Sequence, residues 1–279
     1  MAWPPFKEQL LAAIEPWYLM WWSAQYFIST AYQYFVIEHH FPTPSNLSKV
    51  KEDSFAAFWK WLTRPVIPPP APVGSGTLIP PLLSKARGAV LDIGPGSGSH
   101  VTGFSDNPAI TGIFGAEPSV GLHSDLQARI DDAQLTGKYH ILNSTAERAP
   151  LLLALRKQDI QIDSDKPLFD TIVTIRVMCS VPDLDQSTRD LYQLLKPGGQ
   201  ILVVEHVKNQ WTTTGSILGR SMQVIYHLLG WKFFLGGCHM NRDTAATWKK
   251  AGAWAKVDLK RDFEWAPLTY VSGTLTKPL

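Results

Sequence analysis

Residues 90–99 read Val-Leu-Asp-Ile-Gly-Pro-Gly-Ser-Gly-Ser, an apolar run that leads into a turn rich in glycine. The apolar run predicts a buried strand, and glycine permits positive φ and lets a ligand approach the backbone closely. A turn of this kind after the first strand of an α/β sheet is where such sheets bind nucleotides. The stretch therefore predicts an α/β fold and a ligand site together.

The spacing of the glycines narrows the choice of ligand. They stand at positions 94, 96 and 98, whereas a dinucleotide-binding loop reads Gly-x-Gly-x-x-Gly. An acid, Asp92, lies two residues before the first glycine, where its carboxylate would repel a pyrophosphate. The pattern favours a ligand that has a positive centre and an amino group.

Short β-branched runs alternate with helical stretches from residue 88 onward, which predicts a doubly wound α/β sheet. The expected strands are Ala89–Ile93, Thr111–Ala116, Tyr139–Leu142, Phe169–Ile175, Gln200–Glu205, Ala255–Leu259 and Tyr270–Leu275. The expected helices lie near 98–106, 119–133, 146–156, 185–195 and 242–252.

The glycine loop resembles the first motif of the class I S-adenosylmethionine (SAM) dependent methyltransferases, which implies a seven-stranded Rossmann-like sheet and SAM as the cofactor. A second match is Ile113 to Ser119, in which Glu117 ends the second strand. An acid there can accept hydrogen bonds from both ribose hydroxyls, although a helix-capping role is the alternative. A third match is Asn143 to Glu147, a turn that borders the adenine in this family. The cofactor-binding residues expected from the residues and the resemblance are Asp92, Gly94, Pro95, Gly96, Gly98, Glu117, Ala146, Glu147 and Arg176.

Three further segments, 177–181, 205–207 and 237–242, look like the animal alkyl thiol methyltransferases. That family is membrane-associated and methylates small thiols. The chain is also similar to the ubiquinone and menaquinone C-methyltransferases. The resemblance covers about residues 88–279, and Pro95 and Arg176 depart from the residues usual in these families. It implies transfer of a methyl group to a small lipophilic acceptor, at a thiol, a hydroxyl or a carbon.

Methyl transfer from a sulfonium is a direct displacement, so a base is needed only where the acceptor must lose a proton. His206 is the best candidate, because it follows the fifth strand and imidazole titrates near neutrality. A histidine that only holds its loop is the alternative. His239 and Tyr226 are further catalytic candidates, the latter in an insert at 211–240 that we expect to wall an apolar substrate pocket. No metal site is expected.

Two other functions remain open at this stage: a methyltransferase fold that uses its pocket for a non-methylating cyclisation or rearrangement, and a non-catalytic SAM-binding partner protein. A nucleic-acid substrate is not expected. The formal charge is only +2, and no basic stripe is present. The two cysteines indicate a reducing compartment, so the expected location is cytoplasmic, with membrane association on the cytoplasmic side left open. The oligomeric state is not predicted.

The aromatic residues are unevenly distributed, since the first 61 residues hold 16 of the 31. Within them, residues 16–37 carry no charged side chain, and their apolar residues recur at helical spacing. Three interpretations stand: a helix packed on the rest of the protein, a helix in a membrane interface that makes peripheral contact, or a membrane span. The expected organisation is an aromatic helical cover at 1–64, a Pro/Gly-rich linker with a lead-in helix at 65–87, and the methyltransferase domain at 88–279.

Overall fold

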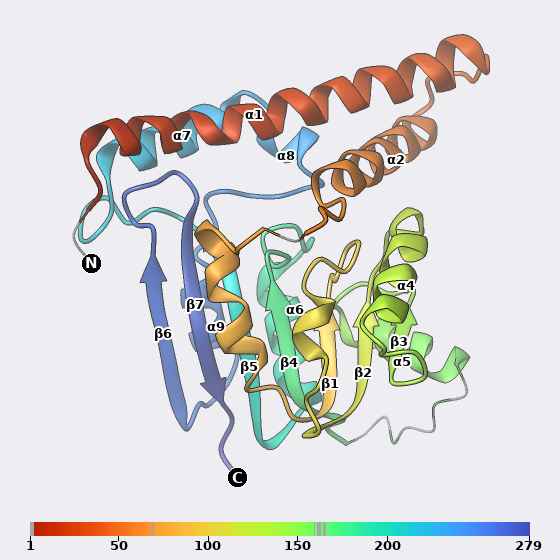
Figure 1. Ribbon diagram of the computed structural model, residues 1–279, viewed down its shortest axis with the longest axis vertical. Coiled ribbons are helices and arrows are strands. Elements are labelled where there is room, and N and C mark those ends of the chain that lie inside the picture. The colour runs from red at the N-terminus through yellow and green to blue at the C-terminus, as the bar shows by residue number, and fades with distance from the viewer. Residues whose placement is uncertain (1–2, 69, 159, 161–162, 164–165) are drawn as a thin grey trace. The chain divides into compact units, whose positions relative to one another are not determined.

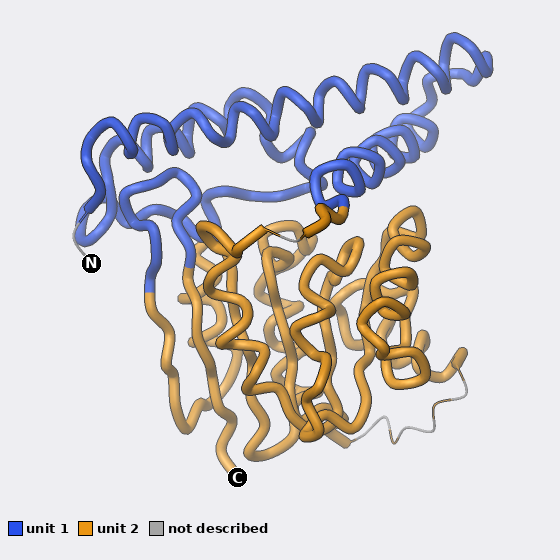
Figure 2. Tube along the Cα trace, viewed as in Figure 1, with its two compact units in different colours: residues 1–64, 206–242, 261–270 blue, residues 65–205, 243–260, 271–279 orange. Residues whose placement is uncertain are grey.

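The computed structural model describes residues 3–68, 70–158, 160, 163 and 166–279; Pro69 of the expected linker lies outside these residues. The chain forms two compact units (Figure 2). Unit 1 consists of Met1–Arg64, His206–Arg242 and Arg261–Tyr270, and unit 2 of Pro65–Glu205, Asp243–Lys260 and Val271–Leu279. The N-terminal segment thus shares a unit with residues 211–240, an insert that we expected to belong to the methyltransferase domain.

Among the described residues, a seven-stranded sheet forms the centre of unit 2 (Figure 1). The ends of strands β5, β6 and β7 are residues that belong to unit 1. The expected α/β class and all seven expected strands are confirmed. The strands are β1 (Gly88–Ile93), β2 (Ile110–Ala116), β3 (Tyr139–Leu142), β4 (Phe169–Ile175), β5 (Leu195–Val207), β6 (Lys256–Asp262) and β7 (Thr269–Thr276).

The strand order is β3-β2-β1-β4-β5-β7-β6, and the pairs from β3 to β5 are parallel. In Figure 1 the arrow of β7 points opposite to that of β6, so the sheet is mixed. The order of the strands reverses between β1 and β4. Ligands of doubly wound sheets bind at such a reversal, beyond the carboxyl ends of the strands. The glycine loop follows β1 and therefore begins at this place.

The central strands are apolar and buried rather than alternating, as a sheet covered on both faces requires. Leu91 in β1, Ile172 in β4 and Val203 in β5 are fully buried. The helices of unit 2 are α3 (Pro80–Leu83), α4 (His123–Asp132), α5 (Arg148–Lys157), α6 (Leu184–Leu194) and α9 (Thr244–Lys250).

The prediction of a helix at 98–106 is wrong. The chain there forms a turn followed by a short 3₁₀-helix, Val101–Phe104. The residues at its two ends explain the difference, because Gly98 has φ +82° and Asp106 has φ +57°. An α-helix needs negative φ throughout, so only a short turn of helix fits between them.

Unit 1 is built from helices: α1 (Phe6–Ala31), a π-helix (Tyr32–Ile37), α2 (Pro44–Leu62), α7 (Ile217–Leu228) and α8 (Trp231–Phe234). Apolar residues at helical spacing predict a second N-terminal helix only from about Glu52 to Leu62, whereas α2 begins at Pro44, eight residues earlier. The reason lies in its first turn, where Thr43 caps the backbone N–H of Asn46 and Pro44 occupies the first helical position.

Helix α1 contacts α2, α7 and α8. The Ser23 hydroxyl donates to the carbonyl of Phe234, and the ring of Trp22 lies 4.8 Å from that of Trp61. Met20 of this helix is buried, whereas Trp21 remains about half exposed. None of the helices within the described residues combines the length and apolarity that crossing a bilayer would need.

Candidate cofactor and catalytic sites

The glycine loop of unit 2 adopts a backbone that only glycine accepts easily. Gly94, Gly96 and Gly98 all have positive φ, between +59° and +82°. A Cβ at Gly94 would lie 2.3 Å from Val177 Cγ2, and one at Gly98 would lie 2.9 Å from Leu126 Cδ1. Conformation and space both require glycine at these two positions, and the loop can therefore bring its backbone close to a ligand.

Glu117 is held against this loop from the end of β2. One carboxylate oxygen accepts the backbone N–H of Gly96 at 2.8 Å, and the other accepts that of Ser119 at 2.9 Å. The side chain is 5% exposed, and burial raises its pKa above the ordinary value despite these two N–H donors. The loop and the acid, which only the family resemblance connects in the sequence, are thus in direct contact.

Asp92 lies at the centre of a buried polar network. Its carboxylate accepts from the hydroxyl of Tyr139 at 2.8 Å, and His100 Nε2 lies 3.0 and 3.1 Å from the two oxygens. The carboxylate is fully buried, and burial, then the charge of Asp92, raises the pKa of Tyr139 well above its ordinary value. Asp92 therefore connects β1 to Tyr139 on β3 and to His100, which follows the glycine loop, and its direct contact with a cofactor stays a prediction.

Arg176 lies immediately after β4, next to the strand-order reversal. Its backbone has φ +57°, which is uncommon for a residue with a side chain. Its Nε is buried and has no hydrogen-bond partner within the described residues, and the same holds for the Ser119 hydroxyl, two residues beyond Glu117. Buried polar atoms are almost always paired. Two unpaired polar atoms at the ends of β4 and β2 are what a polar ligand would satisfy.

The remaining expected cofactor residues of unit 2 line the same rim of the sheet. Pro95 and Ala146 are buried, and Glu147 precedes α5 as its N-cap residue. The carboxylate of Glu147 accepts a hydrogen bond of 3.3 Å from the hydroxyl of Ser187. The contacts of Ala146 and Glu147 with adenine, and the role of Pro95 in binding the cofactor, stay predictions.

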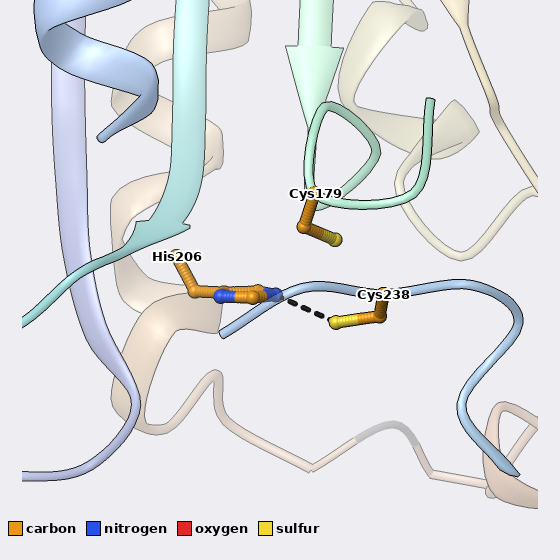
Figure 3. A group of neighbouring side chains, drawn as sticks. All are labelled: Cys179, His206 and Cys238. Carbon is orange, nitrogen blue, oxygen red and sulfur yellow. Dashed lines mark hydrogen bonds between the residues drawn. The ribbon is translucent and has the colours of Figure 1, made fainter. Parts of the chain in front are cut away.

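His206, the expected base, forms a buried cluster in unit 1 with two residues that lie far from it in sequence. His206 Nε2 lies 3.0 Å from Cys238 Sγ (Figure 3). The indole N–H of Trp231 donates to the same sulfur, also at 3.0 Å. The three side chains are at most 7% exposed. We call them the thiol cluster. The chemistry available there is proton exchange between an imidazole and a thiol.

Tyr226 and His239, the other catalytic candidates, both belong to unit 1. Tyr226 is buried on α7, and its hydroxyl donates to the carbonyl of Ala13 on α1 at 2.7 Å, so the hydroxyl joins two helices. Burial raises its pKa. His239 follows Cys238 directly, and its ring lies 6.3 Å from that of His227. Burial, then the charge of Arg242, lowers the pKa of His239. Their catalytic roles stay predictions.

Sequence reasoning missed Tyr139, His100 and Cys238 as members of these clusters. Tyr139 reads as a strand residue, and nothing in its spacing indicates that its hydroxyl reaches Asp92, 47 residues earlier. The run Gly237-Cys238-His239 is the one sequence signal for Cys238, and it indicates a family resemblance rather than a contact with His206.

The sheet order and the glycine loop with its acid define the architecture of the class I SAM-dependent methyltransferases. The model of a family described as a methyltransferase domain matches residues 75–254, and the chain belongs to this family.

Two curated relatives and one solved structure are similar to the chain. The ubiquinone/menaquinone biosynthesis C-methyltransferase UbiE of Vibrio vulnificus is 26% identical over 125 residues, which is 43% of this chain and 41% of the relative. The human thiol S-methyltransferase TMT1A is 28% identical over 101 residues, 36% of this chain and 38% of the relative. The chain thus spans about two fifths of the length of both. An O-methyltransferase family protein from Burkholderia thailandensis matches with a TM-score of 0.52 and 13% identity, over 96% of this chain and 71% of the other, which supports the fold.

Proposed function

We propose that this protein transfers the methyl group of SAM to a small lipophilic acceptor by in-line displacement. The contact between the Gly96 N–H and the Glu117 carboxylate, at 2.8 Å, carries the proposal. It joins a loop that presents backbone to a ligand with an acid suited to two neighbouring hydroxyls. A ligand that has a ribose next to a group lying on the glycine backbone needs both features at one place.

The bonding capacity of Glu117 fits a ribose. Each carboxylate oxygen accepts one backbone N–H, and a carboxylate has about four acceptor positions in total. One position on each oxygen therefore remains for a ribose hydroxyl. The ligand's hydroxyls would also stabilise the charged form of a group whose pKa burial raises.

Arg176 fits the opposite end of SAM. Its unpaired, buried Nε belongs to a guanidinium, whose planar donors match a carboxylate. SAM carries one carboxylate, in its methionine part. We assign Arg176 to that group, because a charged partner would relieve the cost of the unpaired donor.

When bound, SAM supplies a methyl group activated by a positively charged sulfur. The residues of this chain hold the cofactor, orient the acceptor and exclude water. A thiol, with a pKa of about 8.5, is a few per cent ionised near neutral pH and needs little help. A hydroxyl acceptor needs a base. His206 would take that proton, and its contact with Cys238 gives the imidazole a second group with which to share it.

The choice of acceptor rests on the names of the two curated relatives, one acting on carbon and the other on a thiol. Neither exceeds 28% identity to this chain, so the acceptor atom is left as thiol, hydroxyl or carbon. The non-methylating reaction and the non-catalytic SAM-binding role have no specific observation in their favour.

Two measurements on the full-length protein test the proposal. Isothermal titration with SAM should give saturable heat, which Glu117→Gln should reduce at least tenfold in affinity and the exposed control Arg156→Gln should leave unchanged. Incubation with methyl-labelled SAM and a panel of thiols, phenols and quinones should move label into at least one acceptor. Absence of SAM binding by folded protein would refute the proposal, and binding without label transfer to any acceptor would favour the two alternatives.

A further inference from the structure

Two histidines of unit 1, His227 and His239, lie near each other, and we call them the histidine pair. The centroids of their rings are 6.3 Å apart, and the ring planes differ by 31°. His227 belongs to the last turn of α7, and His239 follows α8. Both side chains are half-buried. Two imidazoles at this separation can contact one ligand together, because each protonated ring has two N–H donors.

The loop after α8 brings His239 back to the end of α7. Gly236 and Gly237 have φ +58° and +81°, and this left-handed backbone reverses the direction of the chain. The indole N–H of Trp231 then holds the sulfur of Cys238 at 3.0 Å. His239 is the next residue, so the thiol cluster fixes the backbone from which its ring projects.

The groups that act electrostatically on His239 are all basic. Burial lowers the pKa of His239 most, and Arg242, Lys232 and His227 lower it further. Residues 206–242 contain no aspartate or glutamate. None of the acids in the rest of the described part of unit 1 is among the causes of this lowered pKa; these acids are Glu8, Glu15, Glu38, Glu52, Asp53, Asp262 and Glu264. The histidine pair therefore lies in a positive field.

One ring nitrogen of the pair has no partner. Nδ1 of His227 is buried and makes no hydrogen bond within the described residues. Buried polar atoms are almost always paired, and leaving one unpaired is costly. A negatively charged acceptor would pair this atom and also balance the positive field. The dipole of α7 favours the protonated form of an imidazole in the last turn, which is the form that donates to an anion.

We propose that His227, His239, Lys232 and Arg242 form a binding site for a small oxyanion, a carboxylate or a phosphate, and that the two imidazoles take up protons as the anion binds. Guanidinium, ammonium and imidazolium groups donate charge-assisted hydrogen bonds to such oxygens. A divalent metal ion is the competing occupant, because imidazoles are common metal ligands. The two permanent positive charges disfavour it. This inference concerns binding alone and does not depend on methyl transfer.

Magnetic resonance of the histidine ring protons tests the proposal on the full-length protein without SAM, with His227→Gln and His239→Gln identifying the two signals. Sodium phosphate or sodium acetate, added at about pH 6, should move both signals saturably, and sodium chloride of equal ionic strength should not. The anion that binds more tightly identifies the oxyanion. Bound anion should raise the pKa of His239. At about pH 8 the affinity should be about tenfold weaker or less, because both imidazoles are then neutral.

A charge-matched pair of variants makes the test specific. Lys232→Gln with Arg242→Gln should weaken anion binding by about 10- to 100-fold. Lys249→Gln with Lys250→Gln, which removes two exposed positive charges from α9 in unit 2, should bind as the parent does. The pH dependence of the parent protein decides the question if the first variant does not fold.

Three results would overturn the proposal. The first is the absence of saturable shifts with either anion in the folded parent. The second is equal weakening in the two double variants, which would show only the effect of net charge. The third is Zn²⁺ that binds to the histidine pair of the parent, and to neither single-histidine variant, while phosphate and acetate do not bind.

Discussion

The hydroxyl of Tyr139 on β3 donates to Asp92 on β1 at 2.8 Å, passing over the strand between them. That strand, β2, carries Gly115 directly beside Asp92 in register. A Cβ at Gly115 would lie 2.4 Å from the tyrosine oxygen. A glycine in the middle strand therefore allows a side chain of the outer strand to reach the acid that precedes the glycine loop.

Replacing Tyr139 with Phe should destabilise the protein by about 1–3 kcal/mol, because the buried carboxylate of Asp92 loses a hydrogen-bond donor. Urea unfolding followed by circular dichroism measures the change. The control is Tyr18→Phe, which alters a tyrosine that is 53% exposed. Equal stability of the Tyr139 and Tyr18 variants would show that the hydrogen bond contributes nothing.

Gly115→Ala should also destabilise the protein, since its added methyl group meets the Tyr139 ring. In the background of Tyr139→Leu, which removes that ring, the same change should cost much less. The coupling between the two substitutions in a double-mutant cycle measures the contact directly. Additive effects would contradict the close approach.

Glu117→Gln should change the stability of the folded protein and its affinity for SAM in different directions. Burial raises the pKa of Glu117 in the folded protein, so this group favours the folded state most at low pH. That contribution is lost as the pH rises from the ordinary value, 4.5, through the raised folded value. Glutamine stays neutral, so the variant should become more stable relative to the parent as the pH rises through this range.

Urea unfolding of both proteins from about pH 4 to about pH 7 measures this difference. Near neutral pH the variant should be at least as stable as the parent and yet bind SAM at least tenfold more weakly. In the parent, SAM affinity should fall as the pH drops through the raised pKa of Glu117. A variant that loses stability and affinity together at neutral pH would indicate a purely structural role.

Arg176→Gln should weaken the binding of SAM by about 10- to 100-fold, which is the loss expected for one charge-assisted hydrogen-bonded pair. The sharper measurement compares SAM with an analogue that lacks the methionine carboxylate. If Arg176 binds that group, the variant should discriminate between the two ligands far less than the parent does. Unchanged discrimination would remove Arg176 from the carboxylate site.

His206→Gln should slow methylation of a phenol or alcohol by about 10²- to 10⁴-fold, which is the contribution of a general base. Methylation of a thiol should be slowed much less. Cys238→Ser, which keeps a donor and acceptor beside the imidazole, serves as the control for damage to the thiol cluster. An equal loss on both acceptor types in His206→Gln would show that His206 only holds its loop.

Much of unit 2 could be predicted from local pattern. Buried parallel strands are continuous apolar runs with glycine or proline at their ends, and the boundaries of β3 and β4 are those expected. The glycine loop was recognisable because its conformation restricts the residue type itself. The helix expected at 98–106 failed because φ at Gly98 and Asp106 is positive, which the residue types allow without requiring.

Unit 1 was predicted less well, because it is formed by three segments that lie far apart in the sequence. The chain from 1 to 64 has an aromatic helical pattern whose partner was not identifiable, and the structure places it with residues 206–242 and 261–270. Residues 16–37 follow helical spacing, yet the structure buries Met20 and leaves Trp21 about half exposed. Helical spacing assigns a side of the helix but does not say what covers it.

Local sequence was sufficient for the fold class, the strands and the glycine loop, because backbone conformation and burial on both faces leave signatures within a few neighbouring residues. Tertiary structure was needed for the rest. Only it brought Glu117 to the Gly96 N–H, Tyr139 to Asp92 and Cys238 to His206, since these pairs are separated by 21 to 47 residues. Such contacts depend on strand order and loop path, which no local spacing encodes.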